Sequence, residues 1–183
     1  MKRCACPNRL AGFTIIELLA SVAIIGLLAS VAMPVIQTAL TRQKEAQLRA
    51  ALISIRNALD AYNEAVICGN IAQQSTGDPR YPFKPEYLIV GIPNQLYQPQ
   101  QANQSSQCQQ SNLANQPQMM YFLRSIPRDP FYPDKTTPAV QTWAWRSYSS
   151  DNGFTTYDQV QFVFDVQSMS MQTGLNGVPY NQW

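Results

Sequence analysis

The sequence predicts an α+β fold in which one long N-terminal helix packs on a small C-terminal antiparallel sheet. Two patterns indicate the helix: an uncharged apolar run over 18–40, and an apolar face that recurs every three or four residues over 48–66. A third pattern, large apolar residues at every second position over 160–166, indicates a strand. With 183 residues, the chain has room for one modest domain in addition to a stem.

The chain begins with a basic leader, residues 1–12, which contains Lys2, Arg3 and Arg9 and no acidic residue. A positive segment of this kind favours a cytoplasmic location for this end of the chain. The leader ends at Gly12, and Glu17 is a single carboxylate at the start of the apolar run that follows. A charge inside an apolar membrane helix costs about 2.5–3.5 kcal/mol on insertion scales, so such a residue usually marks a function.

The apolar stem, residues 13–40, is long enough to cross a membrane. Between Leu18 and Leu40 there is no charged residue, and twenty residues of helix span about 30 Å. Gly26 and several alanines lie among the bulky residues, which allows helices to approach closely. Pro34 removes one backbone hydrogen bond, so we expect it to kink or loosen the helix there.

Beyond the stem, residues 41–68 are predicted to form the amphipathic half of the same helix. Glu45 precedes Arg49 by four residues, which is the spacing of a stabilising ion pair on a helix. We expect the helix to run from about Phe13 to about Ile67 and to end at Gly69. Its apolar face is formed by Leu48, Leu52, Ile55, Leu59, Tyr62 and Val66.

The remaining residues, 69–183, are predicted to form a globular head. Within it, 87–90 is either a short strand or a buried loop segment, and 98–118 is a polar loop rich in Gln and Asn. The prolines of 127–131 are expected to make a rigid corner. Strands at 143–148 and 160–166, separated by a turn at Asp151-Asn152-Gly153, should form an antiparallel hairpin packed against the helix.

These features resemble those of type IV prepilins and type II secretion pseudopilins. The resemblance lies in Gly12 as the cleavage position, Phe13 as the new N-terminus, Glu17 as the glutamate of the family, and Pro34 as a proline that many members carry. It implies that a prepilin peptidase cleaves after Gly12, that Phe13 is N-methylated, and that Glu17 sets the register between neighbouring subunits in a filament. The corner at 127–131 resembles that of major pseudopilins, to which the chain looks closest.

The function implied by this resemblance is structural. The mature subunit would assemble through its N-terminal helix into a type II secretion pseudopilus or a type IV pilus. Its partners would be the prepilin peptidase, other pilin or pseudopilin subunits and an inner-membrane assembly platform. It would be held in the bacterial inner membrane by one helix, with the head in the periplasm, before it enters a filament.

Other readings remain open at this stage. The chain is alternatively a minor pilin that primes the filament or binds DNA or glycan through its head. A simple membrane-anchored or secreted binding domain is a further alternative, and 29–32 resembles an ordinary signal-peptidase site.

The composition argues against an enzyme and against a nucleic-acid-binding protein. The chain has no histidine, which removes the usual general base and the commonest metal ligand, and no phosphate-binding glycine loop. The net charge is +2, but three of the thirteen Lys and Arg residues lie in the leader, which leaves ten against eleven acidic residues. Such a balance lacks the excess of positive charge that phosphate binding requires.

Three further sites are candidates. Cys68 and Cys108 could form a disulfide or remain two unpaired thiols; the bridge would be worth about 3–4 kcal/mol in the chain-entropy model. Resemblance to major pseudopilins implies a calcium site, for which Asp151, Asp158 and Asp165 are available, although the tail after Asp165 has no acidic residue. No other cofactor is expected. The aromatic residues of the two predicted strands could form a stacking platform, but their alternation favours a core-facing sheet.

Overall fold

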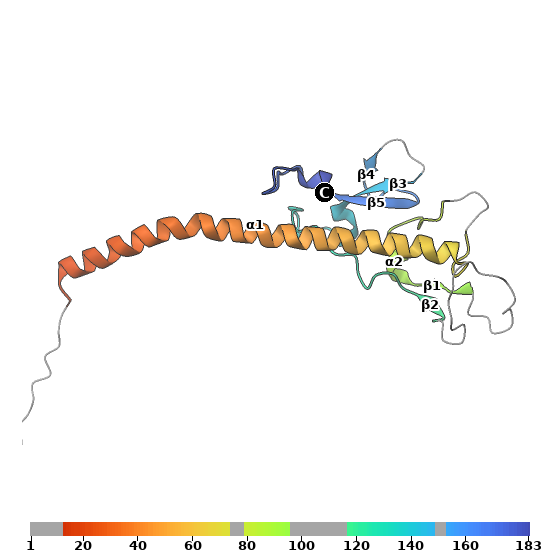
Figure 1. The fold of residues 1–183 in the computed structure, drawn as a ribbon, viewed down its shortest axis with the longest axis horizontal. Helices are drawn as coiled ribbons and strands as arrows, with labels where there is room; N and C mark the ends of the chain where they lie inside the picture. Colours follow the sequence, from red (N-terminus) through yellow and green to blue (C-terminus); the bar gives the residue numbers. More distant parts are fainter. Residues whose placement is uncertain (1–12, 74–78, 96–116, 149–152) are drawn as a thin grey trace, which may run out of the picture. The chain divides into compact units, whose positions relative to one another are not determined.

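The computed structural model describes residues 13–73, 79–95, 117–148 and 153–183. The chain divides into two compact units, Met1–Thr41 and Arg42–Trp183. Its elements are α1 (Ile15–Ile67), α2 (Tyr87–Val90), β1 (Ile92–Pro93), β2 (Met119–Met120), η3 (Ala139–Thr142), β3 (Trp143–Ser147), β4 (Phe154–Thr155), β5 (Val163–Ser168) and η4 (Tyr180–Gln182). The predicted α+β architecture, a long N-terminal helix with small antiparallel sheets after it, is confirmed (Figure 1).

The helix α1 ends where the sequence predicts. Gly69 has a φ of +76°, a left-handed conformation that glycine adopts without strain. The amide of Gly69 donates to the carbonyl of Val66 at 3.1 Å, and the amide of Asn70 donates to the carbonyl of Ala65 at 2.9 Å. These two bonds form the Schellman arrangement that satisfies the last carbonyls of a helix.

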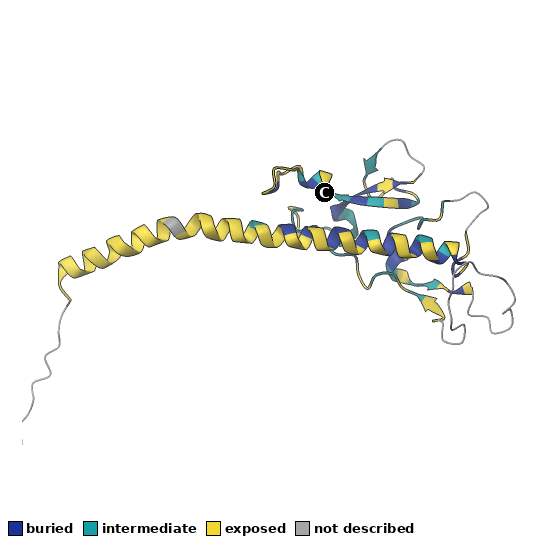
Figure 2. Cartoon of the chain, viewed as in Figure 1, coloured by how far each residue is buried: buried dark blue, intermediate teal, exposed yellow. Residues whose placement is uncertain are grey.

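The first unit has no core of its own. Each residue of 13–40 whose exposure is described is exposed in the single chain, and Figure 2 shows this part of α1 in the colour of exposed residues. Among the described residues, α1 is the one helix long and apolar enough to cross a membrane. An uninterrupted apolar surface of this size is stable only when a membrane or other helices cover it.

The second unit has a core built around one face of α1. Five of the six residues predicted to form the apolar face of 41–68 are fully or almost fully buried, and Val66 packs beside them. In Figure 1 this half of α1 passes between the three-stranded sheet on one side and α2 with the two-stranded sheet on the other. The main members of the core are Leu48, Leu52, Ile55, Leu59, Leu88, Trp143, Trp145, Val160, Val163, Val166 and Tyr180.

The three-stranded sheet has the order β4-β3-β5, with both pairs antiparallel. The predicted hairpin partners, β3 and β5, do pair, but the prediction that one turn joins them directly was wrong. After the predicted turn, of which only Gly153 is described, the chain first forms β4 on the other edge of β3. The turn therefore leads into β4, and β5 begins at Val163 instead of 160.

The side chains of β5 that face the core also differ from the prediction. Ser147 pairs with Val163 and Arg146 with Asp165, so Phe164 is an extra residue at a β-bulge. Because the bulge shifts the alternation by one residue, Val163 is buried while Phe164 is 39% exposed. Strict alternation had predicted the opposite arrangement for this pair.

The segment 87–90 is neither of the two structures that its sequence suggested. It forms α2, a single helical turn in which the amide of Val90 donates to the carbonyl of Glu86 at 3.0 Å. Pro85 precedes the N-cap residue Glu86, and its carbonyl accepts a hydrogen bond from the amide of Leu88 at 3.2 Å. Leu88 is fully buried and Ile89 packs against the core, whereas Tyr87 and Val90 are exposed.

Candidate assembly surface

The start of α1 is fixed by Thr14. The backbone amide of Glu17 donates to the hydroxyl oxygen of Thr14 at 3.3 Å and to its carbonyl oxygen at 3.1 Å. This is the capping interaction expected when Thr and Glu are separated by three positions at a helix start. Glu17 also places a negative charge in the first turn, where the helix dipole favours it. The carboxylate thus has a structural role in addition to the role that its position predicts.

The residues around the predicted cleavage position are accessible as far as they are described. Phe13 is 80% exposed and Glu17 is exposed, whereas Gly12 lies outside the described residues. An exposed Phe13 at the start of the helix is compatible with an enzyme reaching this peptide bond. The predicted roles of Gly12, Phe13 and Glu17 stay predictions.

Around Pro34, α1 is helical on both sides. The hydroxyl of Thr38 donates to the carbonyl of Pro34 at 2.9 Å, and the hydroxyl of Ser30 donates to the carbonyl of Leu27 at 2.8 Å. Such bonds from hydroxyl groups back to carbonyls satisfy polar groups within an apolar helix, and they often accompany bending. The expected kink or loosening at Pro34 stays a prediction.

A buried carboxylate on α1 binds the C-terminal tail. Glu45 is 8% exposed, and its Oε1 atom accepts hydrogen bonds from the amide of Leu175 at 2.7 Å and from the hydroxyl of Tyr180 at 3.0 Å. Burial, followed by this bond to Glu45, raises the pKa of Tyr180 to about 12. The predicted ion pair of Glu45 with Arg49 was wrong, because the carboxylate is committed to the tail.

Two arginines of α1 extend this contact with the tail. The guanidinium of Arg49 lies 4.3 Å from the centroid of the Trp183 ring. Arg56 donates to Asp165 at 2.9 Å, to the carbonyl of Val166 at 3.0 Å and to the carbonyl of Trp183 at 2.9 Å. We call Glu45, Arg49 and Arg56 together the tail clamp.

The corner at 127–131 is organised by Asp129, which is 1% exposed. Its carboxylate accepts from the hydroxyl of Ser168 at 2.6 Å and from the amide of Phe131 at 2.8 Å. Burial raises the pKa of Asp129, while these hydrogen bonds oppose the shift. Trp143 of β3 donates to the carbonyl of Pro127 at 2.7 Å, which joins the other end of the corner to the sheet. The expected fixed corner therefore has a specific cause: one buried carboxylate bridges it to the end of β5.

The proposed calcium ligands are only partly described. Asp165 is paired with Arg56, and Asp158 is exposed, while Asp151 lies outside the described residues. Within the described ranges no three acidic, Cys or His side chains come together as a metal site would require. Calcium binding stays a prediction, and at Asp165 a cation would have to compete with a guanidinium.

Cys68 is disulfide-bonded in the structure. It is buried just after the last residue of α1, and the hydrogen-bonded turn at Gly69 follows it. Cys108 lies outside the described residues, as does most of the predicted polar loop 98–118. The pairing of Cys68 with Cys108 stays a prediction.

The aromatic residues of the sheet divide into two groups. Trp143 and Trp145 are fully buried, which is the core role that the sequence favoured. Tyr148 and Phe164 are 57% and 39% exposed, and both lie against Tyr81 with ring centroids 5.3 Å apart. The second group is a small surface cluster, held by contacts between its own rings.

The tail clamp and the role of Asp129 were not predicted from the sequence. The residues were visible, but their partners lie far away along the chain: Glu45 and Tyr180 are separated by 135 positions, and Arg56 and Asp165 by 109. The available signal in the sequence was that polar residues lie on α1 beside an apolar face. Since other parts of the chain must cover that face, they can also reach these polar residues.

A comparison with known protein families finds a match. The family profile described as the prokaryotic N-terminal methylation motif matches residues 7–33. No curated protein matches the chain, and no solved structure matches it. The matched region comprises the end of the basic leader and the first three quarters of the apolar stem, and it contains Gly12, Phe13 and Glu17.

Proposed function

Because the chain carries the N-terminal methylation motif of the type IV prepilin and pseudopilin family, we propose that it is a filament subunit that is cleaved after Gly12 and methylated on Phe13. The observation that carries this proposal is the combination of the motif with a stem whose apolar side chains have nothing to cover them within the single chain. The stem provides the drive for assembly: burying a large apolar side chain is worth roughly 1.5–3 kcal/mol.

We propose the type II secretion pseudopilus as the filament, with the type IV pilus as the second candidate. The support is the corner at 127–131 followed by an antiparallel sheet, which resembles major pseudopilins. The subunit would wait in the inner membrane with its head in the periplasm, and the assembly platform would move it into the filament with other subunits. The positive leader and the disulfide at Cys68 support this orientation, since disulfides persist outside the cytoplasm.

Glu17 is proposed to pair with the N-terminal amine of a neighbouring subunit. Two charges in an apolar filament core attract strongly, but only good geometry offsets the loss of their hydration. A pair of this kind would therefore stabilise one axial offset between neighbouring subunits relative to all others. In the unassembled subunit the same carboxylate lies in the first turn of α1, where the helix dipole stabilises its charge.

A minor subunit that primes the filament or binds a ligand is the alternative within the same class. The exposed rings of Tyr148 and Phe164 favour a surface contact of some kind. The uncharged tail and the nearly balanced charge of the mature chain do not favour a nucleic acid. The motif indicates a structural subunit and gives no support for an enzymatic role.

The test is to express the full chain with a prepilin peptidase and the assembly machinery and to determine the mature N-terminus by mass spectrometry. A chain that starts at methylated Phe13 supports the proposal. Glu17→Ala should be cleaved normally but should be lost from filaments, and Glu64→Ala, which removes an exposed carboxylate near the other end of α1, should assemble normally. Cleavage near Ala32, or no cleavage, would refute it.

A further inference from the structure

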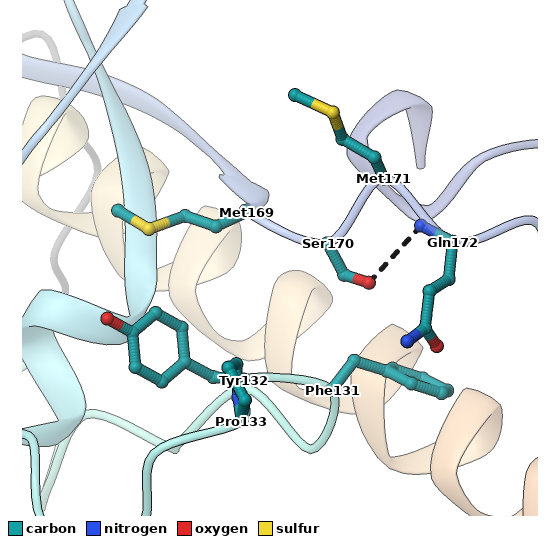
Figure 3. A pocket seen from close by; sticks show the side chains of 7 residues that line it. All are labelled: Phe131, Tyr132, Pro133, Met169, Ser170, Met171 and Gln172. Atoms are coloured by element: carbon teal, nitrogen blue, oxygen red, sulfur yellow. Dashed lines mark hydrogen bonds between the residues drawn. The ribbon is translucent and has the colours of Figure 1, made fainter.

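A pocket of about 480 Å³ in the second unit has aromatic walls with positive charges beside them. The corner and the segment that follows β5 line it from two sides, as Figure 3 shows. The Nζ atom of Lys44 lies 6.0 Å from the centroid of the Phe131 ring, and the guanidinium of Arg128 lies 6.0 Å from that of the Tyr132 ring. The pocket therefore combines apolar walls with cations at its aromatic rings.

The C-terminal loop beside the pocket is ordered and exposes apolar side chains. Met171, which also lines the pocket, is 83% exposed, and Leu175 and Val178 are 52% and 37% exposed. The loop is closed by a hydrogen bond from the amide of Gly174 to the carbonyl of Val178 at 2.9 Å. A surface that is already fixed loses little conformational entropy when it binds a partner.

Positive side chains outnumber negative ones around this loop and pocket. Glu45 and Asp129 are buried and accept hydrogen bonds within the head, so their charges do not face a partner. Asp134 is exposed and interacts electrostatically with Arg128. The exposed or partly exposed cations of 42–49 and of 127–137 are Arg42, Lys44, Arg49, Arg128 and Lys135. Exposed apolar side chains combined with several Lys and Arg residues are typical of a surface that binds a membrane interface with anionic lipids.

The end of the chain adds an aromatic residue of the kind found at such interfaces. Trp183 is partly exposed, and the guanidinium of Arg49 lies 4.3 Å from the centroid of its ring. Its indole N–H donates to the carbonyl of Val178 at 3.3 Å, which keeps the ring beside the loop. Tryptophan is enriched where a bilayer meets water, because its ring has an apolar body and one polar group.

The position of this surface along α1 favours the membrane over other partners. Glu45 holds the amide of Leu175 at 2.7 Å, and Glu45 is only five residues beyond Leu40, where the uncharged run ends. Five residues of helix span about 8 Å, and the headgroup region on each side of a bilayer is about 5–8 Å thick. Where the stem crosses a membrane, the loop is therefore tethered within reach of the headgroups, and any other partner would have to compete with lipid that is already there.

We propose that, before assembly, this surface binds the headgroup region of an anionic phospholipid bilayer, with Met171 and Leu175 in the interface and Lys44 and Arg49 beside lipid phosphates. We call these four residues together the membrane-facing surface. The inference rests on one part of the proposed function, namely that the stem spans a membrane before the subunit enters a filament. It adds a contact between head and lipid that has to break when the subunit leaves the bilayer.

The test places the photo-crosslinking residue p-benzoylphenylalanine at Met171 in the full chain, reconstituted into vesicles of equal parts phosphatidylglycerol and phosphatidylcholine. The matched control position is Val90 of α2, which is 66% exposed. A carbonyl of α2 accepts from the amide of Phe122, whose ring contacts that of Tyr62, and Tyr62 is 17 residues beyond Glu45, about 25 Å along α1. We expect about fivefold more lipid adduct from position 171 than from position 90, measured by mass spectrometry.

A third position separates failure of this inference from failure of the proposed function. Val22 is 60% exposed in the stem, so p-benzoylphenylalanine there should form lipid adducts wherever the stem spans the bilayer. Adducts at position 22 with equal yields at 171 and 90, or cross-links from 171 to a second protein chain in place of lipid, would overturn the head contact alone. A chain that gives no lipid adduct at position 22 would refute membrane anchoring and, with it, both proposals.

A charge substitution provides an independent readout. Lys44→Gln should reduce the adduct at position 171 about threefold in the mixed vesicles and should have no effect in pure phosphatidylcholine, because only the anionic lipid attracts the ammonium group. Arg80→Gln removes a positive charge at an exposed position beside the cluster of Tyr81 and should leave both yields unchanged. Equal adduct from the wild type in the two kinds of vesicle would overturn the assignment to an anionic bilayer.

Discussion

Arg56 of α1 donates to the carboxylate of Asp165 on β5 at 2.9 Å, and this is the one ion pair among the residues that the structure describes. The same guanidinium also binds the carbonyls of Val166 and Trp183. One side chain thus joins the helix, the last strand and the end of the tail. The contribution of Arg56 to stability comes from these bonds together, since a partly exposed ion pair alone contributes little.

The first prediction is that Arg56→Met destabilises the second unit by about 1–2 kcal/mol, because hydrogen bonds to charged groups are lost while partial exposure reduces their worth. The measurement is urea unfolding of the detergent-solubilised chain, followed by the fluorescence of the buried Trp143 and Trp145. Arg42→Met, at an exposed position on the same helix, is the control and should leave the midpoint unchanged. Equal midpoints for both variants would contradict the prediction.

The second prediction concerns alkaline pH. The pKa of Tyr180 is raised to about 12 from the usual 10.0, chiefly by burial and then by its bond to Glu45. A raised pKa in the folded state means that the stabilisation is fully present below pH 10 and is lost as the pH rises toward 12. Tyr180→Phe should therefore lose less stability than the wild type over this range. Parallel curves of unfolding free energy against pH would show that the hydroxyl is not coupled to folding.

The third prediction concerns acid. Asp134 accepts hydrogen bonds from the hydroxyls of Thr137 and Thr136 and from the amide of Thr136, which lowers its pKa from 3.8 to about 2. A lowered pKa gives stabilisation that is present above pH 3.8 and is lost as the pH falls toward 2. Asp134→Asn should therefore show a shallower loss of stability between pH 4 and pH 2, measured by thermal unfolding. Asp129 is expected to act in the opposite direction, because its pKa is raised by burial.

The fourth prediction tests the end of α1. At Gly69 a Cβ atom would meet nothing within 4 Å, so the φ of +76° is the sole source of strain for a substitution. Gly69→Ala should cost roughly 1–2 kcal/mol, the penalty of a left-handed conformation for an L-residue. Gly69→Asn should cost less, because asparagine tolerates this conformation. Equal effects of the two substitutions in urea unfolding would indicate that contacts, and not the backbone, decide the cost.

The sequence was sufficient for those parts of the fold that depend on neighbours along the chain. The periodicity from Leu48 to Val66 predicted the buried face of α1, and Gly69 predicted its end. It was insufficient for 87–90, because four apolar residues have no period that separates a strand from a helical turn. The sequence also gave the wrong orientation for Phe164. A β-bulge depends on how two strands pair, and the alternation of apolar residues in one strand does not predict it.

The candidate site shows the same division. Gly12, Phe13 and Glu17 form a local motif and could be named from the sequence. The sequence predicts an ion pair of Glu45 with Arg49, because a partner four residues away on a helix can be read from the sequence. That Glu45 binds Leu175 and Tyr180 cannot be read in this way. Contacts across more than a hundred residues are set by the packed structure, so no local pattern reports them.

The tail clamp has a consequence for the order in which the chain acquires its structure. Glu45 and Arg56 lie in the first third of the sequence, but they bind residues at its very end. These polar groups of α1 therefore stay hydrated until residues 175–183 are available to bind them. Contacts between such distant segments close a long loop and so form late. Until this loop closes, Glu45 and Arg56 lack their partners, so the second unit is complete only after its two most distant segments have met.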